Sequence, residues 1–280
     1  SFKLPKSRVE TGEIRFETRV FDDSGRFGAS IKVVPYFASD ALVGIRPENW
    51  LVQAGVETAV DVVVVSPDKK PVADIPVKVE IYKKSGRLIR ERAAGNAYRL
   101  RYDAVEEKVS ECALVSADEP VKCAFTPQDA GEYRATAVIA GSSAKTSFYA
   151  EGGGYVPWEP NKDVLPLTVD RKKYAVGETI EIMVKNPFQN GRALITVERD
   201  GILKSWVQPM KNSMEKVKIE VTEDFFPGVY VSVNLFSPRV ADSSIEPDLG
   251  KPSEKTGYVQ IDVENKTRVL DVKITSDKQK

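Results

Sequence analysis

The chain has 280 residues with 41 basic and 41 acidic side chains, so its formal net charge is zero. A balanced charge does not draw a protein to nucleic acid or to an anionic membrane surface. No apolar run approaches the length of a membrane span, and the first ten residues lack the layout of a signal peptide. We therefore expect no nucleic acid partner and no direct membrane contact. The length suits two or three sandwich modules of about 100 residues.

The sequence contains no histidine. Histidine is the commonest general base and the commonest metal ligand in proteins. Ser-His and Cys-His mechanisms are therefore excluded within this chain, and no pair of carboxylates stands out as acid and base. We predict that the chain is not an enzyme and that it uses no metal or other cofactor.

Short segments with apolar residues at every second position follow one another along the chain. They are "TAVDVVVVSP" (58–67), "IPVKVEIYKK" (75–84), "EYRATAVIA" (132–140), "TIEIMVKNP" (179–187), "ALITVERDG" (193–201), "KVKIEVTED" (216–224) and "VYVSVNLF" (229–236). Such alternation is typical of half-buried strands, and the Pro, Gly, Asn and Asp residues between them are typical of turns. The pattern predicts an all-β protein built from tandem antiparallel β-sandwiches.

Two cysteines, Cys112 and Cys123, flank the turn-like segment "SADEP". A hairpin folded about Ala117 and Asp118 would place the two sulfur atoms opposite each other. A disulfide there would add about 2–3 kcal/mol and would indicate an oxidising compartment, such as a periplasm or the cell exterior. The alternative is a pair of free thiols on neighbouring strands.

Three further motifs have simple structural explanations. The acidic segment 21–26 lacks the spacing of a calcium loop, so we predict a hairpin turn there. The glycines of "EGGGYVPWEP" (151–160) open no helix, which favours a flexible linker over a phosphate-binding loop. Trp50, Trp158 and Trp206 lie near module edges, where we expect them to pack at domain junctions rather than to bind a ligand.

Internal repeats define the organisation of the chain. Segments 12–36 and 131–150 share a Gly-Glu-x-Arg opening, a strand, a turn of small residues and a second strand, as expected of a module's closing hairpin. The segments beginning at Leu42 and Leu165 match each other as module openings. The repeats predict four parts: the last strands of a preceding module (1–40), a complete module (41–151), a second complete module (152–265) and the truncated first strand of a following one (266–280).

The closing hairpin of the 152–265 module has an enlarged connection. Its strands, 227–236 and 256–264, match the other closing hairpins, but "SPRVADSSIEPDLGKPSEK" replaces their short turns "DDSGR" and "AGSSA". The extension costs only on the order of 1 kcal/mol in loop-closure entropy. Its prolines oppose both helix and ladder formation. We therefore predict a long exposed loop over 237–256.

Residues 165–207, "LPLTVDRKKYAVGETIEIMVKNPFQNGRALITVERDGILKSWV", resemble the bait-region domain of bacterial α2-macroglobulins. The shared features are an initial strand, a Tyr-x-x-Gly-Glu-Thr turn, an Asn/Ser-Pro-Phe segment and the "ALITVERDG" strand. The run "VTEDFFPGVYVSVNLF" is similar to a late strand of that domain, and "ALVGIRPENW" with the rest of its module is similar to the macroglobulin-like domain that precedes it. The resemblance covers nearly the whole chain from about residue 12 and is densest over 165–236.

The resemblance implies fibronectin-III-like, macroglobulin-like domains from a broad-spectrum protease inhibitor. In this family a bait segment is cut by many proteases, and the cut releases a conformational change that traps the protease. Members with a Cys-x-Glu-Gln thioester also tether the protease covalently, but neither "CALV" nor "CAFT" is such a motif, so this chain carries no thioester. The implied partners are proteases, the other domains of the polypeptide and a cell-wall glycosyltransferase. The implied location is a bacterial periplasm or cell envelope, with a lipid anchor upstream.

The 237–256 loop is the expected bait, because protease clefts bind exposed, extended and varied substrate. The candidate cleavage positions are Arg239, Lys251 and Lys255 for trypsin-like proteases and Phe236, Ile245 and Leu249 for proteases with apolar pockets. Lys251 is the poorer basic target because Pro252 follows it. The alternatives are an ordinary disordered surface loop, or a structural or adhesive array of sandwich modules on a bacterial surface in which the loop binds a ligand or merely links.

Overall fold

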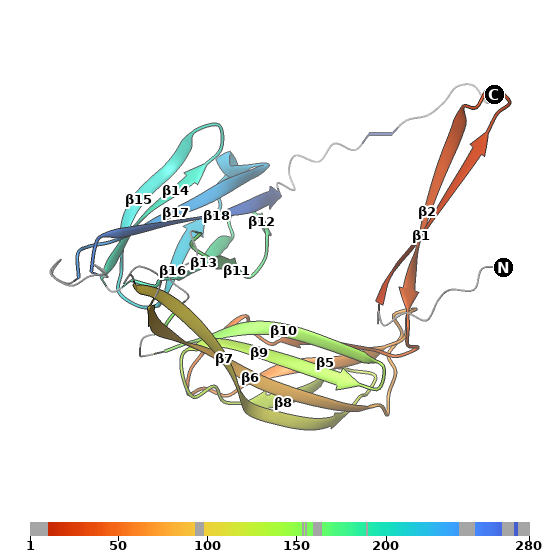
Figure 1. Ribbon diagram of the computed structural model, residues 1–280, viewed down its shortest axis with the longest axis horizontal. Helices are drawn as coiled ribbons and strands as arrows, with labels where there is room; N and C mark the ends of the chain where they lie inside the picture. Colours follow the sequence, from red (N-terminus) through yellow and green to blue (C-terminus); the bar gives the residue numbers. More distant parts are fainter. Residues whose placement is uncertain are drawn as a thin grey trace. The chain divides into compact units, whose positions relative to one another are not determined.

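Figure 1 shows the computed structural model of the chain, which is almost entirely β-structure. It describes residues 11–92, 98–152, 154, 156–158, 164–188, 190–240, 250–264 and 272–273. The chain divides into two compact units, one made of residues 1–84 and 106–152 and the other of residues 85–105 and 153–280. Within the described ranges no helix is long and apolar enough to cross a membrane.

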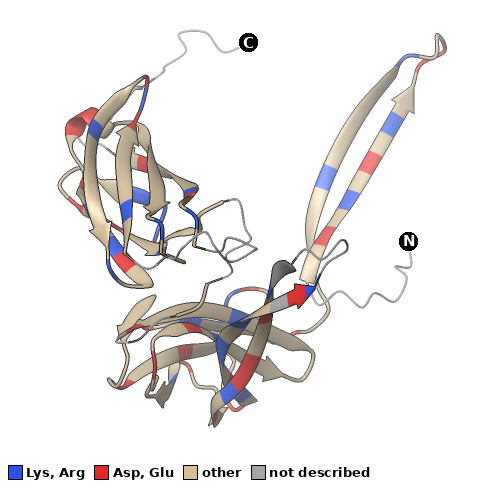
Figure 2. Cartoon of the chain, turned by 60° about the vertical axis from the view of Figure 1, so that its left-hand side comes forward, with Lys and Arg blue, Asp and Glu red and all other residues tan. Residues whose placement is uncertain are grey.

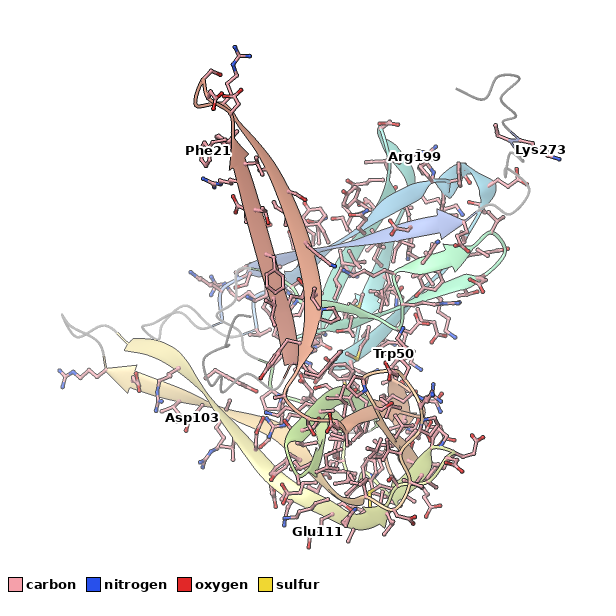
Figure 3. The ribbon with its side chains drawn as sticks, turned by 90° about the vertical axis from the view of Figure 1, so that its right-hand side faces the viewer. Phe21, Trp50, Asp103, Glu111, Arg199 and Lys273 are labelled. Atoms are coloured by element: carbon pink, nitrogen blue, oxygen red, sulfur yellow. A yellow bond between two sulfur atoms is a disulfide. The ribbon has the colours of Figure 1, made fainter. Side chains whose placement is uncertain are left out.

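Strands β1 (Thr11–Phe21) and β2 (Phe27–Phe37) form an antiparallel hairpin. The predicted turn is present between them, and Phe21 lies at this end of the hairpin (Figure 3). The Asp22 carboxylate accepts hydrogen bonds from the Ser24 hydroxyl and from the backbone N–H groups of Ser24 and Arg26. These bonds, the Ser24 hydroxyl first, lower the pKa of Asp22. Figure 2 shows acidic and basic residues alternating along β1. They occupy every second position, so their side chains lie on the same face of the strand.

The first complete module is a sandwich of two sheets. Its strands are β3 (Leu42–Pro47), β4 (Leu51–Gln53), β5 (Thr58–Val65), β6 (Pro76–Arg92), β7 (Tyr98–Val115), β8 (Val121–Phe125), β9 (Gly131–Ile139) and β10 (Ser142–Glu151). One sheet has the order β3-β5-β8 and the other β4-β10-β9-β6-β7. Alternate valines of β5 are buried in the core. The aromatic rings of Phe125, Tyr133 and Phe148 pack in the same core, with 5.5–6.2 Å between their ring centres.

The second complete module repeats this arrangement. Its elements are β11 (Leu167–Val169), β12 (Lys173–Ala175), β13 (Thr179–Lys185), β14 (Gly191–Glu198), β15 (Ile202–Met210), β16 (Met214–Glu220), the 3-10 turn η2 (Glu223–Phe225), β17 (Gly228–Ser237) and β18 (Ser253–Glu264). The sheets have the orders β11-β13-β16 and β12-β18-β17-β14-β15. Strands β11 to β18 therefore take the places of β3 to β10, in agreement with the predicted repeat. The two short pairs β4–β10 and β12–β18 are parallel, which the sequence analysis did not predict.

Cys112 and Cys123 form a disulfide, but not within a hairpin as predicted. Cys112 lies on β7 in the five-stranded sheet, directly after Glu111 (Figure 3), and Cys123 lies on β8 in the three-stranded sheet. Their Cα atoms are 6.0 Å apart. The bridge therefore joins the two layers of the sandwich, and the Cys123 side is buried in the core.

The β6–β7 hairpin is longer than the sequence analysis indicated, because the predicted strand 75–84 continues to Arg92. Its outer part, residues 85–105, belongs to the second compact unit. Gly86 lies beneath the ring of Tyr102, where any side chain on residue 86 would collide with that ring. The Tyr102 hydroxyl donates a hydrogen bond of 3.1 Å to the carbonyl oxygen of Pro157 in the linker.

The sequence predicts a flexible linker over 151–160, but two of its described residues, Val156 and Trp158, make specific contacts. The backbone N–H of Val156 donates to the Ser213 hydroxyl (2.9 Å), and the Trp158 indole donates to the Ser213 carbonyl oxygen (2.6 Å). The Lys185 ammonium lies 4.8 Å from the centre of the Trp158 ring. Trp206, which we expected at a domain junction, packs instead against the core of its own module.

Candidate functional site

The enlarged connection begins and ends in a continuous antiparallel ladder. Strands β17 and β18 pair from Gly228 opposite Asp262 to Ser237 opposite Ser253. β17 is central in its sheet, with β14 on one side and β18 on the other. The inward side chains of both strands are buried in the module core, as the period-2 alternation predicts. The ends of the connection are thereby fixed next to each other.

The paired strands extend further into the connection than predicted. The sequence predicts a loop over 237–256, whereas β17 ends at Ser237 and β18 begins at Ser253, so the connection between the two strands is 238–252. A backbone hydrogen bond from the N–H of Val240 to the carbonyl oxygen of Gly250 (2.9 Å) also holds the two sides of the loop together beyond the ends of the strands. Residues 253–255 are all polar, so they lack the apolar alternation that marks a strand in the sequence. Ser237, which was also predicted as loop, is the last residue of β17.

The candidate cleavage positions lie in different surroundings. Arg239 and Lys251 are exposed residues of the loop itself. Phe236 lies in β17 opposite Glu254, and Lys255 lies in β18 opposite Leu235, so cutting at either position requires the ladder to open. The remaining candidates, Ile245 and Leu249, lie outside the described residues.

A second segment reaches the base of the loop from the N-terminal side. The linker residue Val164 forms a parallel bridge with Thr256, and the backbone N–H of Leu165 donates to the carbonyl oxygen of Thr256 (2.8 Å). The Thr256 hydroxyl donates to the side-chain oxygen of Asn234 on β17 (2.8 Å). Sequence reasoning missed this contact, because Val164 and Thr256 are far apart in the chain and a single bridge has no periodicity.

The far end of β18 is held by β12, which runs parallel to it. The Lys173 ammonium pairs with the Glu264 carboxylate, and the hydrogen bond in this pair raises the pKa of Lys173. On the same strand Tyr174 is buried, and its hydroxyl donates to the Asp170 carboxylate. Burial and then this bond raise the pKa of Tyr174. On the edge that faces away from β17, β18 is thus contacted by the linker near its start and by β12 near its end.

The described residues contain no group of three Cys, Asp or Glu side chains placed to hold a metal ion. Both cysteines are bound in the disulfide, so neither is a free nucleophile. The described part of the connection presents exposed residues directly beside the paired ladder, namely 238–240 and 251–252.

Both complete modules match models of known protein families. Residues 165–280 match the alpha-2-macroglobulin bait region domain, and residues 44–155 match bacterial macroglobulin domain 6. The chain belongs to the bacterial α2-macroglobulin family. The enlarged β17–β18 connection of this α2-macroglobulin chain lies within the part that matches the bait region domain.

The chain is also similar to individual proteins. An alpha-2-macroglobulin homolog of Nostoc sp. is 22% identical over 268 residues, which cover 92% of this chain and 14% of the relative. The native conformation of Escherichia coli α2-macroglobulin is 19% identical, with a TM-score of 0.40 over 91% of this chain and 17% of that one. The Y1175G mutant of Salmonella α2-macroglobulin is 18% identical, with a TM-score of 0.41 over 96% and 18%. The chain thus spans only a small part of the curated relative's length.

Proposed function

We propose that this chain is the bait-bearing part of a protease-trapping α2-macroglobulin and that its bait is the loop 238–252. In this role the loop is offered to proteases of differing specificity, and its cleavage starts the trapping response of the whole protein. The chain itself acts as substrate and scaffold rather than as an enzyme. The implied partners are proteases and the remaining domains of the same polypeptide.

One observation carries the proposal: this closing connection alone is enlarged between strands that still pair to their ends. In the preceding module the equivalent strands, β9 and β10, are joined by only Ala140 and Gly141. In the 152–265 module the ladder is intact from Gly228 to Ser237, yet the connection runs from 238 to 252. A bait needs such a placement, because the segment must be accessible to a cleft while the module that presents it stays folded.

The decisive experiment is limited proteolysis of the full chain with several proteases of different specificity, followed by mapping of the earliest cuts. We expect most first cuts between 238 and 252. For a trypsin-like protease the first cut should follow Arg239, because Lys251 precedes Pro252 and Lys255 lies in the ladder.

Two matched variants test whether Arg239 is the first tryptic site. Arg239→Gln should slow the first tryptic cut within the loop, whereas Lys255→Gln should leave its rate unchanged. First cuts in the 152–154 segment or at the termini, with the loop left intact, would remove the support for a bait. They would favour the alternative of a structural or adhesive array.

We further propose that the chain acts in a bacterial periplasm or cell envelope. The support is the Cys112–Cys123 disulfide, since such bonds persist in oxidising compartments and are rare in the cytosol. Thiol labelling of the native protein taken directly from its source should find both cysteines unreactive until a reductant is added. Rapid labelling without reductant would contradict this location.

A further inference from the structure

The linker meets β18 at the base of the loop, and we call this contact the linker clip: Val164, Leu165, Thr256 and Gly257. Besides the Val164–Thr256 bridge and the hydrogen bond from Leu165 to Thr256, the clip includes a close crossing at Gly257. The side chain of Leu165 is 1% exposed and belongs to the module core. The linker is therefore anchored in the 152–265 module, which we call the bait module, next to Thr256 and just beyond the outermost ladder residues 253–255.

Gly257 permits this crossing because it has no side chain. A methyl group at residue 257 would collide with the carbonyl oxygen of Leu165 and would lie 3.0 Å from Cγ of Leu167. Glycine is required here for space, since the backbone of the linker passes directly over the strand. Gly257 is thus a positioning residue for the linker.

Thr256 is held on both edges of β18. Its carbonyl oxygen accepts from the linker, so by the alternation of antiparallel ladders the residues on either side of it, Lys255 and Gly257, face β17. Its hydroxyl adds a bond to Asn234 on β17. Opening the ladder past this residue would therefore break contacts on two sides and uncover the buried side chain of Leu165.

We propose that the linker clip stops the opening of the β17–β18 ladder once the loop has been cut. An intact loop holds the strand ends together, and a cut removes that constraint. The outer pairs, beginning with Ser237 opposite Ser253, are then free to fray. Fraying ends at Thr256, and the linker keeps its place on the bait module after cleavage. The inference rests on the proposed bait function, because it assigns a role to these residues after a cut in the loop.

The test needs a defined cut that does not depend on which bonds natural proteases prefer. A recognition sequence for a single specific protease is inserted between Ser243 and Ser244 of the full chain. Amide hydrogen exchange is then measured at residue resolution before and after cutting. The amide of Ser253 should exchange at least about tenfold faster after the cut, whereas those of Gly257 and Leu165 should change by less than about twofold.

Two results would overturn the proposal. Acceleration at Leu165 equal to that at Ser253 would show that the opening passes through the clip. An unchanged rate at Ser253 would show that the ladder does not open and that nothing needs to be stopped. The two proposals fail separately, because the exchange experiment uses an engineered cut. First cuts by natural proteases outside the loop would contradict the bait function, but they would not change the exchange rates that test the clip.

Variants test whether Gly257 is responsible. Gly257→Ala should speed exchange of the Leu165 amide at least about tenfold in the uncut chain, because the linker must move away from the strand. Tyr258→Thr is the matched control: residue 258 is 63% exposed on the other face of the same strand, so the exchange rate of Leu165 should not change. Wild-type protection of Leu165 in Gly257→Ala would exclude the positioning role. If Gly257→Ala fails to fold, the comparison of cut and uncut chains still decides the proposal.

Discussion

The two complete modules share one strand order but enlarge different hairpins. In the 41–151 module the closing turn is short, and the β6–β7 hairpin is extended to strands of 17 and 18 residues. In the 152–265 module the equivalent β14–β15 turn spans only 199–201, and the β17–β18 connection is extended. The shared sandwich thus tolerates additions at either position, because the added residues lie outside the core.

The modules also differ in how they hold the corner after the fifth strand of the repeat, which is β7 in the 41–151 module and β15 in the 152–265 module. In the 41–151 module the Cys112–Cys123 disulfide joins β7 to β8 across the two sheets. In the 152–265 module the buried Asn186 side chain, at the end of β13, donates to the carbonyl oxygens of Met210 and Asn212. One module uses a covalent bond and the other a buried polar network for the same task.

Breaking the disulfide should have the largest effect and should be confined to one module. The bridge spans 11 residues, and a loop of this size contributes about 3 kcal/mol to the free energy of unfolding. Reduction, or the double substitution of Cys112 and Cys123 by alanine, should destabilise the 41–151 module by about this amount. Hydrogen exchange of the full chain in mild denaturant measures each module separately. An equal loss in the 152–265 module would contradict independent stabilisation of the two corners.

Asn186→Ala should have the next largest effect, in the other module. Asn186 is fully buried, and its side-chain oxygen also accepts from the backbone N–H of Phe188 (2.9 Å). Alanine leaves these buried groups without their partner, which costs about 2 kcal/mol. The same exchange measurement should report the loss in the 152–265 module only. The exposed Asn212 provides the control, since Asn212→Ala should change stability by less than about 0.5 kcal/mol.

The sequence predicted those features that recur with a period. Alternation located most strands, and the aligned repeats indicated that the closing hairpins of the two modules, β9–β10 and β17–β18, are equivalent. Strands of three residues, such as β4 and β12, are too short to show alternation, so their parallel pairing was not predicted.

The errors concern contacts between distant segments. Nearness in sequence suggested that Cys112 and Cys123 share a hairpin, although β7 and β8 belong to different sheets. Residues 253–255 at the start of β18 resembled loop because all three are polar, so the apolar alternation that marks a strand is missing there. The linker clip joins Leu165 to Thr256, and no local pattern encodes such a pairing. The position of the loop was therefore predictable, but its bounds and its anchoring were not.

The smallest predicted effect concerns the alkaline stability of the two modules. The hydroxyl of Tyr174 donates to the Asp170 carboxylate, whereas that of Tyr133 in the 41–151 module donates to the backbone carbonyl of Asp129. Burial raises the pKa of both tyrosines, and the carboxylate acceptor raises that of Tyr174 further. A raised folded-state pKa means that this stability is fully present below about pH 10, the unfolded value, and is lost as the pH rises toward the folded value.

Unfolding of the 152–265 module between pH 9 and pH 11 tests this assignment, with an expected loss from Tyr174 of about 1.4 kcal/mol by pH 11. Tyr174→Phe should lower stability at neutral pH by about 1 kcal/mol, because the hydrogen bond to Asp170 is lost, and should flatten the alkaline decline. Tyr230→Phe is the control, since Tyr230 is 52% exposed in the same module. An alkaline decline that is just as steep in Tyr174→Phe would show that ionisation of other groups governs it, and that the buried tyrosines do not distinguish the two modules.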